Sequence, residues 1–241
     1  MGTEWWEGPV PKTKFAPKHK VPIYVAKDGT DEFVSRLYNY VQKVENEIIA
    51  KEALVSEVPK PEHDPYQHTQ QWKQHNLIKD FAGLDGGHLE RFPQDEVTTQ
   101  LFNLIRTNYL LHLANLNYPR IKVWIHCWAN VLQKGQWISR HNHMSHDSAY
   151  LAGTYYLTGN ATNLYLENPM NPKDVVQVAT EQKKIVFFPS YIQHWSDVCN
   201  EDYRVSIAFD VVLEDTVIGN PYRPHILLDD PLTMPGLDGR L

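Results

Sequence analysis

Three histidines in two short segments have the types and spacing of a metal site. His141 and His143 are two residues apart, and His194 follows an apolar run that ends at Pro189. If the first segment is extended, both of its imidazoles lie on one face of the chain. A loop after the second segment can bring a third imidazole to the same point. Three protein ligands leave coordination positions open for substrate or oxygen, so the pattern indicates a catalytic metal.

The elements that must position these histidines are short strands from residue 120 onward. Ile121, Val123, Ile125 and Cys127 alternate with Lys122, Trp124, His126 and Trp128, which is the period of a strand. Further strands are predicted at 137–143, 150–157, 163–167, 175–179, 184–188 and 204–213. Several short strands separated by turn residues are typical of an all-β sandwich or barrel.

Two amphipathic helices are predicted before this β-rich region. A strand at 23–26 and a turn at Asp28-Gly29 precede a helix that Thr30 or Asp31 caps and that runs to about residue 53. A second helix begins after Pro93 and stops near 117–119. These helices would cover one face of a sheet.

We therefore predict one domain at 23–218, with helical support at 30–119 and a β core at 120–213. Residues 1–22 are expected to form an extended arm, 55–92 a polar loop region, and 219–241 a coil tail.

Composition narrows the class of protein. The 241 residues are 42% hydrophobic and 22% charged, as in a globular domain, and the formal net charge of −6 argues against nucleic acid as the main partner. Cys127 and Cys199 do not form a disulfide framework, and no signal peptide or membrane span is expected. We predict a cytoplasmic protein that does not bind membranes.

Four motifs in order resemble the 2-oxoglutarate and Fe(II)-dependent oxygenases. They are His141 with a partner two residues on, the strand 151–157, the Phe-Pro-Ser-Tyr-Ile-Gln-His run that ends at His194, and Arg204-Val205-Ser206. The likeness covers about 120–213 and is nearest to a group found in bacteria and marine phages that is distantly similar to prolyl hydroxylases. It implies a mainly β fold, the double-stranded β-helix or jelly-roll barrel, with the metal at its open end.

The resemblance also implies a role for individual residues. His141 matches the first iron ligand, His194 the distal ligand, and Arg204 the arginine that binds the far carboxylate of 2-oxoglutarate. Ser206, Tyr156 and Asn130 match further contacts to this cosubstrate. The chemistry of Arg204 agrees, because a guanidinium binds a carboxylate through paired hydrogen bonds and Ser206, two residues on, would face the same way.

The sequence departs from the family pattern at the second ligand. The family usually has a carboxylate two residues after the first histidine, and this chain has His143. Three neutral imidazoles would leave the site one charge unit more positive. Asp147 is an alternative carboxylate ligand if 144–146 turns back, but the spacing of His143 needs no special loop.

The leading hypothesis is an oxygenase that consumes 2-oxoglutarate and O2, releases succinate and CO2, and hydroxylates an unknown peptidyl or small-molecule substrate. A cupin with a three-histidine site is the second hypothesis, but it does not need the Arg204 and Ser206 pair. A non-catalytic β-barrel binding module is the third, although a structural metal usually has four protein ligands.

Overall fold

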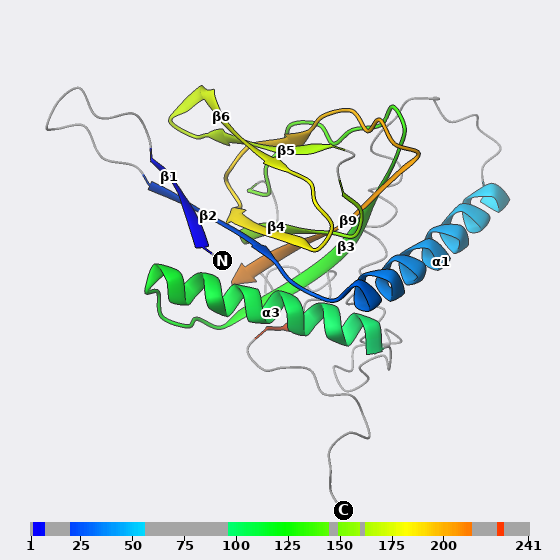
Figure 1. Ribbon diagram of the computed structural model, residues 1–241, viewed down its shortest axis with the longest axis horizontal. Coiled ribbons are helices and arrows are strands. Elements are labelled where there is room, and N and C mark those ends of the chain that lie inside the picture. Colours follow the sequence, from blue (N-terminus) through cyan, green and yellow to red (C-terminus); the bar gives the residue numbers. More distant parts are fainter. Residues whose placement is uncertain are drawn as a thin grey trace, which may run out of the picture.

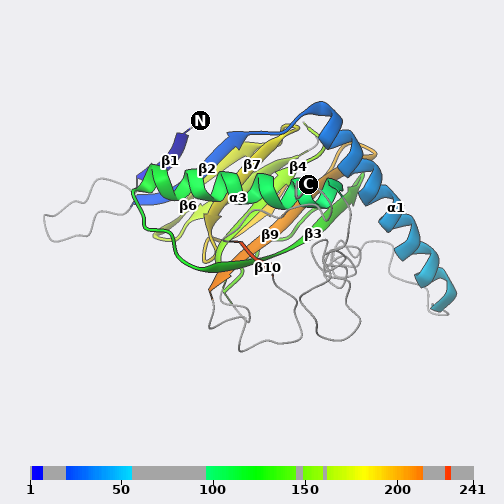
Figure 2. The same cartoon turned by 90° about the horizontal axis from the view of Figure 1, so that it is seen from below.

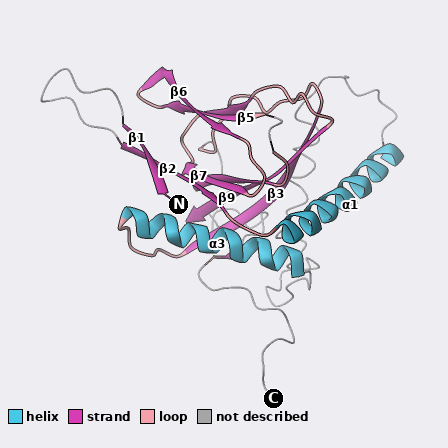
Figure 3. Ribbon diagram, in the orientation of Figure 1, coloured by secondary structure: helices cyan, strands magenta, loops and turns pink. Residues whose placement is uncertain are grey.

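Two antiparallel sheets packed face to face form the body of the protein; α3 (Glu96–Leu116) lies across the larger sheet, and α1 (Asp31–Val55) begins beside α3 and extends outward (Figure 1; Figure 3). The computed structural model describes residues 2–7, 20–55, 96–144, 149–159, 162–213 and 226–228, without side-chain detail at 2–7, 47–55 and 226. The strands are β1 (Gly2–Glu7), β2 (Lys20–Lys27), β3 (Val123–Gln133), β4 (Ala149–Tyr156), β5 (Asn163–Asn168), β6 (Asn171–Ala179), β7 (Lys184–Pro189), β8 (His194–Ser196), β9 (Tyr203–Leu213) and β10 (Ile226–Leu227).

The sheet order is that of a double-stranded β-helix. The larger sheet has seven strands in the order β1-β2-β7-β4-β9-β3-β10, and the smaller sheet has three in the order β6-β5-β8. In the larger sheet several neighbouring strands are distant in sequence, since β4 lies between β7 and β9. The predicted mainly β fold with supporting helices is confirmed.

Side-chain alternation in the larger sheet separates two apolar layers. Residues such as Tyr155, Phe187 and Phe209 point to the helices, and α3 crosses this face of the sheet (Figure 2). Residues such as Tyr156 and Phe188 point the other way and pack with Leu166 of the smaller sheet. Strands β2, β4 and β7 therefore contribute side chains to both cores.

Gly153 in β4 allows the helix-facing layer to close. A Cβ atom at this position would collide with the ring of Phe209 and lie 2.7 Å from the carbonyl oxygen of Val186. The φ angle of Gly153 is not positive, so other residues could adopt its backbone conformation. Glycine is required because the neighbouring atoms leave no room for a Cβ atom. Because Gly153 has no side chain, Phe209 of β9 and Val186 of β7 can lie close to β4 in the centre of the sheet.

The helices begin and pack as the sequence predicted. The hydroxyl of Thr30 accepts a hydrogen bond from the backbone N–H of Phe33 at 3.1 Å, which identifies Thr30 as the cap of α1. In α3 the buried residues include Leu101, Phe102 and Ile105. Among the described residues, no helix is both long and apolar enough to cross a membrane.

Three predicted segments differ from the structure. Residues 2–7 were expected to lie in an arm, but they pair with β2 as β1, because β2 would otherwise be an unpaired edge. In the expected coil tail, β10 pairs with β3. The predicted strand 137–143 is reduced to a single bridge between His141 and His194. The expected polar loop lies almost wholly outside the described residues.

A buried histidine between α3 and the sheet makes the stability of the fold depend on pH. The ring of His112 stacks on Phe187 with centroids 6.1 Å apart and meets the edge of Tyr24 at 5.5 Å. Burial lowers the pKa of His112 from 6.5 to about 4. The unfolded chain therefore binds a proton more readily than the folded chain between these two pH values.

We predict that the free energy of unfolding falls as pH is lowered from about 6.5 to 4, with His112 contributing on the order of 2 to 3 kcal/mol. His112→Phe removes this titration and keeps the aromatic packing. The free energy of unfolding of both proteins is measured in urea at several pH values, and the difference between them should change between about pH 6.5 and 4. The control is Lys173→Ala at an exposed position, whose free energy of unfolding should vary with pH as that of the wild type does. A difference between the wild type and His112→Phe that does not vary with pH would contradict the prediction.

Candidate active site

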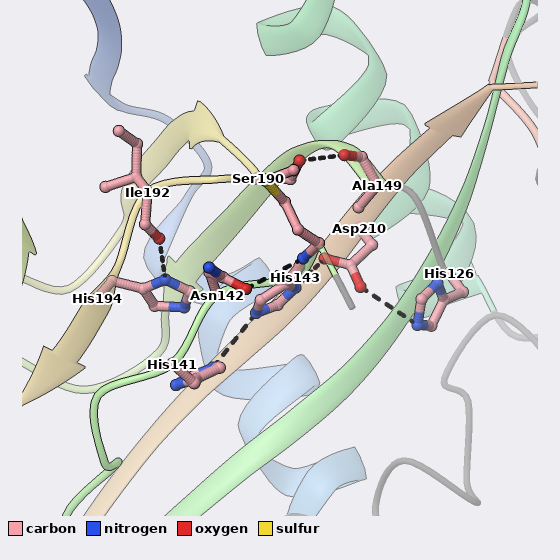
Figure 4. A network of polar contacts seen from close by, with 10 residues as sticks. His126, His141, Asn142, His143, Ala149, Ser190, Ile192, His194 and Asp210 are labelled. Atoms are coloured by element: carbon pink, nitrogen blue, oxygen red, sulfur yellow. Dashed lines mark hydrogen bonds and ion pairs between the residues drawn. The ribbon is translucent and has the colours of Figure 1, made fainter. Parts of the chain in front are cut away.

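The imidazoles of His141, His143 and His194 converge on one point (Figure 4). One nitrogen of each ring lies within 4.8 Å of the corresponding nitrogens of the other two. The Nε2 atoms of His141 and His143 are 3.3 Å apart. Among the described residues this is the group of histidine, cysteine and acidic side chains with metal-binding geometry.

Backbone hydrogen bonds, rather than a continuous strand, bring the two segments together. The N–H of His141 donates to the carbonyl of His194 at 3.0 Å, and the N–H of His194 donates back at 2.8 Å. The N–H of His143 donates to the carbonyl of Ser190 at 3.0 Å. The segment 137–143 therefore bends and still presents both imidazoles, because its contacts are to 190–196 instead of to a regular strand.

The other nitrogen of each ring is already used in a hydrogen bond. Nδ1 of His141 donates to the carbonyl oxygen of Ser139 at 2.7 Å, and Nδ1 of His194 donates to that of Ile192 at 3.0 Å. Nδ1 of His143 contacts a carboxylate oxygen of Asp210. These acceptors place the hydrogen on Nδ1 and leave the Nε2 lone pair for a metal.

The donor set fits a metal ion. Two nitrogens bound to one ion at about 2.1 Å lie roughly 3.0 to 3.4 Å apart, which matches the separation of the Nε2 atoms of His141 and His143. Two lone pairs at this distance repel unless a cation lies between them. Burial, reinforced by the neighbouring His141 and His143, holds the pKa of His194 well below its usual value, so this ring is a neutral ligand.

The three histidines line a cavity of about 330 Å³ between the two sheets. Trp137 and Trp195 line the same cavity, and Trp137 is 39% exposed. The ring of Trp195 stacks on Tyr165 of β5 with centroids 5.6 Å apart. The cavity thus combines a polar site with aromatic walls, as ligand pockets commonly do.

The predicted cosubstrate residues line this cavity as well. Arg204 and Ser206 of β9 are 2% and 0% exposed, and they are joined there by Tyr156 of β4 and Asn130 of β3. The guanidinium carbon of Arg204 lies 5.2 Å from the ring centroid of Tyr156. Burial raises the pKa of the Tyr156 hydroxyl and the charge of Arg204 opposes that rise.

Several polar atoms of this group have no hydrogen-bond partner among the described residues. Within the described part of the chain, no hydrogen bond reaches Nε or Nη1 of Arg204, Oγ of Ser206 or Oδ1 of Asn130. Burying guanidinium N–H groups without an acceptor is costly. The arrangement can therefore bind an anionic ligand inside the cavity.

The structure does not test the prediction for one acidic residue, and it reveals a second acidic residue that was not predicted. Asp147, the predicted alternative ligand, lies outside the described residues. Asp210 was missed, although the sequence holds a signal for it. Asp210 interrupts the mainly apolar strand 205–213. It lies an even number of residues after Arg204 and Ser206, so it faces the same side of the sheet.

A solved structure shares the fold of this chain, although the sequences are distant. No family model and no curated protein match the sequence. The structure is similar to a Pseudomonas putida prolyl-4-hydroxylase, with a TM-score of 0.51 and 13% identity over 80% of this chain and 85% of that one.

Two further solved structures have lower scores. One is a viral collagen prolyl hydroxylase from Paramecium bursaria Chlorella virus-1, with a TM-score of 0.47 and 10% identity over 80% of this chain and 90% of that one. The other is a 2OG-Fe(II) oxygenase family oxidoreductase from Burkholderia pseudomallei, with a TM-score of 0.39 and 12% identity over 77% and 91%. At these identities the likeness is one of fold, and the fold is the double-stranded β-helix.

We predict that the metal-free protein binds one divalent ion and that His141→Ala, His143→Ala and His194→Ala each weaken this binding at least roughly 100-fold, because each removes one of three ligands. Anaerobic calorimetry with Mn(II) measures the affinity. The control is His112→Phe, which replaces a buried histidine away from the cavity and should bind the ion like the wild type. Unchanged affinity in any of the three alanine variants would exclude that histidine as a ligand.

Proposed function

We propose that the protein is an Fe(II)- and 2-oxoglutarate-dependent oxygenase that hydroxylates a peptidyl or small-molecule substrate. One observation carries the proposal. Three imidazoles whose ligand nitrogens lie within 4.8 Å of one another share a cavity with a buried guanidinium, two of whose nitrogens have no acceptor among the described residues. This combination suits an anion that reaches a metal ion with one end and Arg204 with the other.

In this proposal His141, His143 and His194 hold Fe(II) through Nε2. When bound, the iron would supply the O2 chemistry that couples decarboxylation of 2-oxoglutarate to succinate with oxidation of a substrate C–H bond. The contribution of the protein is to aim the three ligands in advance. The carbonyls of Ser139 and Ile192 do this for two of the rings.

Arg204 and Ser206 would bind the far carboxylate of 2-oxoglutarate. The guanidinium offers paired N–H donors to the carboxylate, and the hydroxyl of Ser206 is a further donor. The ring of Tyr156 packs against the guanidinium and restricts its orientation. Asn130, opposite Ser206 in the register of β3 and β9, would contact the cosubstrate through its side-chain amide.

The walls of the cavity would exclude water from the reacting groups. Phe188 packs edge-on against His194 with centroids 4.8 Å apart. Trp137, partly exposed, lines the same cavity and would offer a surface to the substrate. Such a dry and shaped pocket strengthens the electrostatic contacts made inside it.

The cupin hypothesis accounts for the three histidines but gives no role to the buried Arg204 and Ser206 pair. The binding-module hypothesis accounts for neither the three-ligand set nor the guanidinium. A cytoplasmic location and a single domain at 23–218 remain predictions of the sequence. Cys127 and Cys199 are buried, and no disulfide joins them.

We predict that the iron-loaded protein forms succinate from 2-oxoglutarate in the presence of O2 and that Arg204→Ala weakens 2-oxoglutarate binding to the Mn(II)-loaded protein about 100-fold (~2.7 kcal/mol), because the buried carboxylate loses its charged partner. Metal affinity should change less than about threefold. Calorimetry measures both. The control is Arg36→Ala, which removes a surface arginine paired with Glu96 on the helices.

Two results would contradict the proposal. The first is no iron-dependent succinate formation by the wild type, which would favour the cupin or binding-module hypothesis. The second is an equal loss of metal and 2-oxoglutarate binding in Arg204→Ala, which would show that Arg204 supports the fold of the site instead of the cosubstrate.

A further inference from the structure

We infer that Asp210 is a positioning residue for the metal site and that the His143–Asp210 pair takes the place of a carboxylate ligand. The inference rests on the proposed function, because it concerns the same three-histidine site. It explains how the protein tolerates a histidine where a metal site of this kind commonly has an acidic side chain.

The contact between the two side chains is direct. One carboxylate oxygen of Asp210 accepts a hydrogen bond from Nδ1 of His143, and the other lies 3.7 Å from Nε2 of His126 (Figure 4). The carboxylate therefore lies between two imidazoles. Only one of them, His143, belongs to the metal-binding group.

Asp210 is a buried carboxylate in the centre of the larger sheet. It is 4% exposed and lies in the middle of the larger sheet, opposite His126 of β3 and Ala152 of β4. A carboxylate in such a place is costly unless it is paired. An apolar side chain would suit the strand better, so its presence indicates a functional requirement.

Asp210 also makes the three ligands unequal. His141 and His194 each donate from Nδ1 to a neutral backbone carbonyl, whereas His143 donates to a carboxylate. A carboxylate acceptor makes an imidazole a stronger electron donor and fixes its ring orientation more firmly. His143 is therefore the ligand with the most anionic character.

The His143–Asp210 pair also compensates for the loss of the negative charge that a carboxylate ligand would bring to the metal site. Three neutral imidazoles leave a bound divalent ion one unit more positive than two imidazoles and a carboxylate do. Asp210 returns one negative charge next to the second ligand without occupying a coordination position. The site then keeps its open positions and the electrostatics of a mixed histidine and carboxylate set.

The test is a cycle of substitutions read out as metal affinity. We expect Asp210→Asn to weaken Mn(II) binding by the metal-free protein roughly 10- to 100-fold. In a His143→Asp background, which supplies a carboxylate ligand directly, the same substitution should cost less than about threefold. Asp210→Ser gives a second measurement with a smaller side chain, and thermal melting shows that each protein is folded.

A spectroscopic readout separates positioning from general stability. With Co(II) in the site, Asp210→Asn should shift the visible absorption bands, because the donor strength of His143 changes. The control is Glu167→Gln, which neutralises another buried carboxylate, one whose side chain is paired with Arg140. This substitution should change the Mn(II) affinity by less than about twofold and leave the Co(II) spectrum unchanged.

The outcomes distinguish this inference from the proposed function. If the wild type binds no metal, the proposed function fails. If the wild type binds metal and forms succinate but Asp210→Asn has the wild-type affinity and spectrum, only the role of Asp210 is overturned. An equal loss in the His143 and His143→Asp backgrounds would also overturn it, because the effect would not pass through His143.

Discussion

The alternation of side chains along β9 is the constraint on which both the fold and the site depend. Val205, Ile207 and Phe209 face the helices and fill the main core, while Arg204, Ser206 and Ala208 line the cavity and Asp210 contacts His143. Because the period of a strand is two, a shift of one residue would bury the polar set under the helices and turn the apolar set into the cavity. The packing of Phe209 against Gly153 therefore holds the register that the polar residues require.

The second constraint is the pair of reciprocal hydrogen bonds between the backbones of His141 and His194. They join two segments that are more than fifty residues apart in sequence and place two ligands next to each other before any metal binds. The imidazoles are then oriented by acceptors on neighbouring backbone and on β9. A site arranged in this way loses little conformational freedom on binding, which is the physical advantage of preorganisation.

Much of this could be predicted from the sequence, because the signals are local. The alternation of apolar residues predicted the strands, and the cap and amphipathic pattern predicted the first helix. The spacing of His141, His143 and His194 predicted the three-histidine group that the structure brings together. The strand expected at 137–143 was wrong, because its hydrogen bonds go to residues 190–196 and periodicity carries no information about distant partners. Asp210 was missed for the same reason. Its parity with Arg204 is visible in the sequence, but its contact with His143 depends on how β9 lies beside the metal-binding segment.

The crystal structure of the protein with Mn(II) and N-oxalylglycine, an inert mimic of 2-oxoglutarate, would examine the metal ligands and the anion site together. The geometry predicts one ion bound by Nε2 of His141, His143 and His194, with the far carboxylate of the mimic on Arg204 and Ser206. An ion that is bound by Asp147 in place of His143 would contradict the ligand assignment. A mimic whose far carboxylate points away from Arg204, or a guanidinium that turns into solvent, would contradict the oxygenase proposal itself.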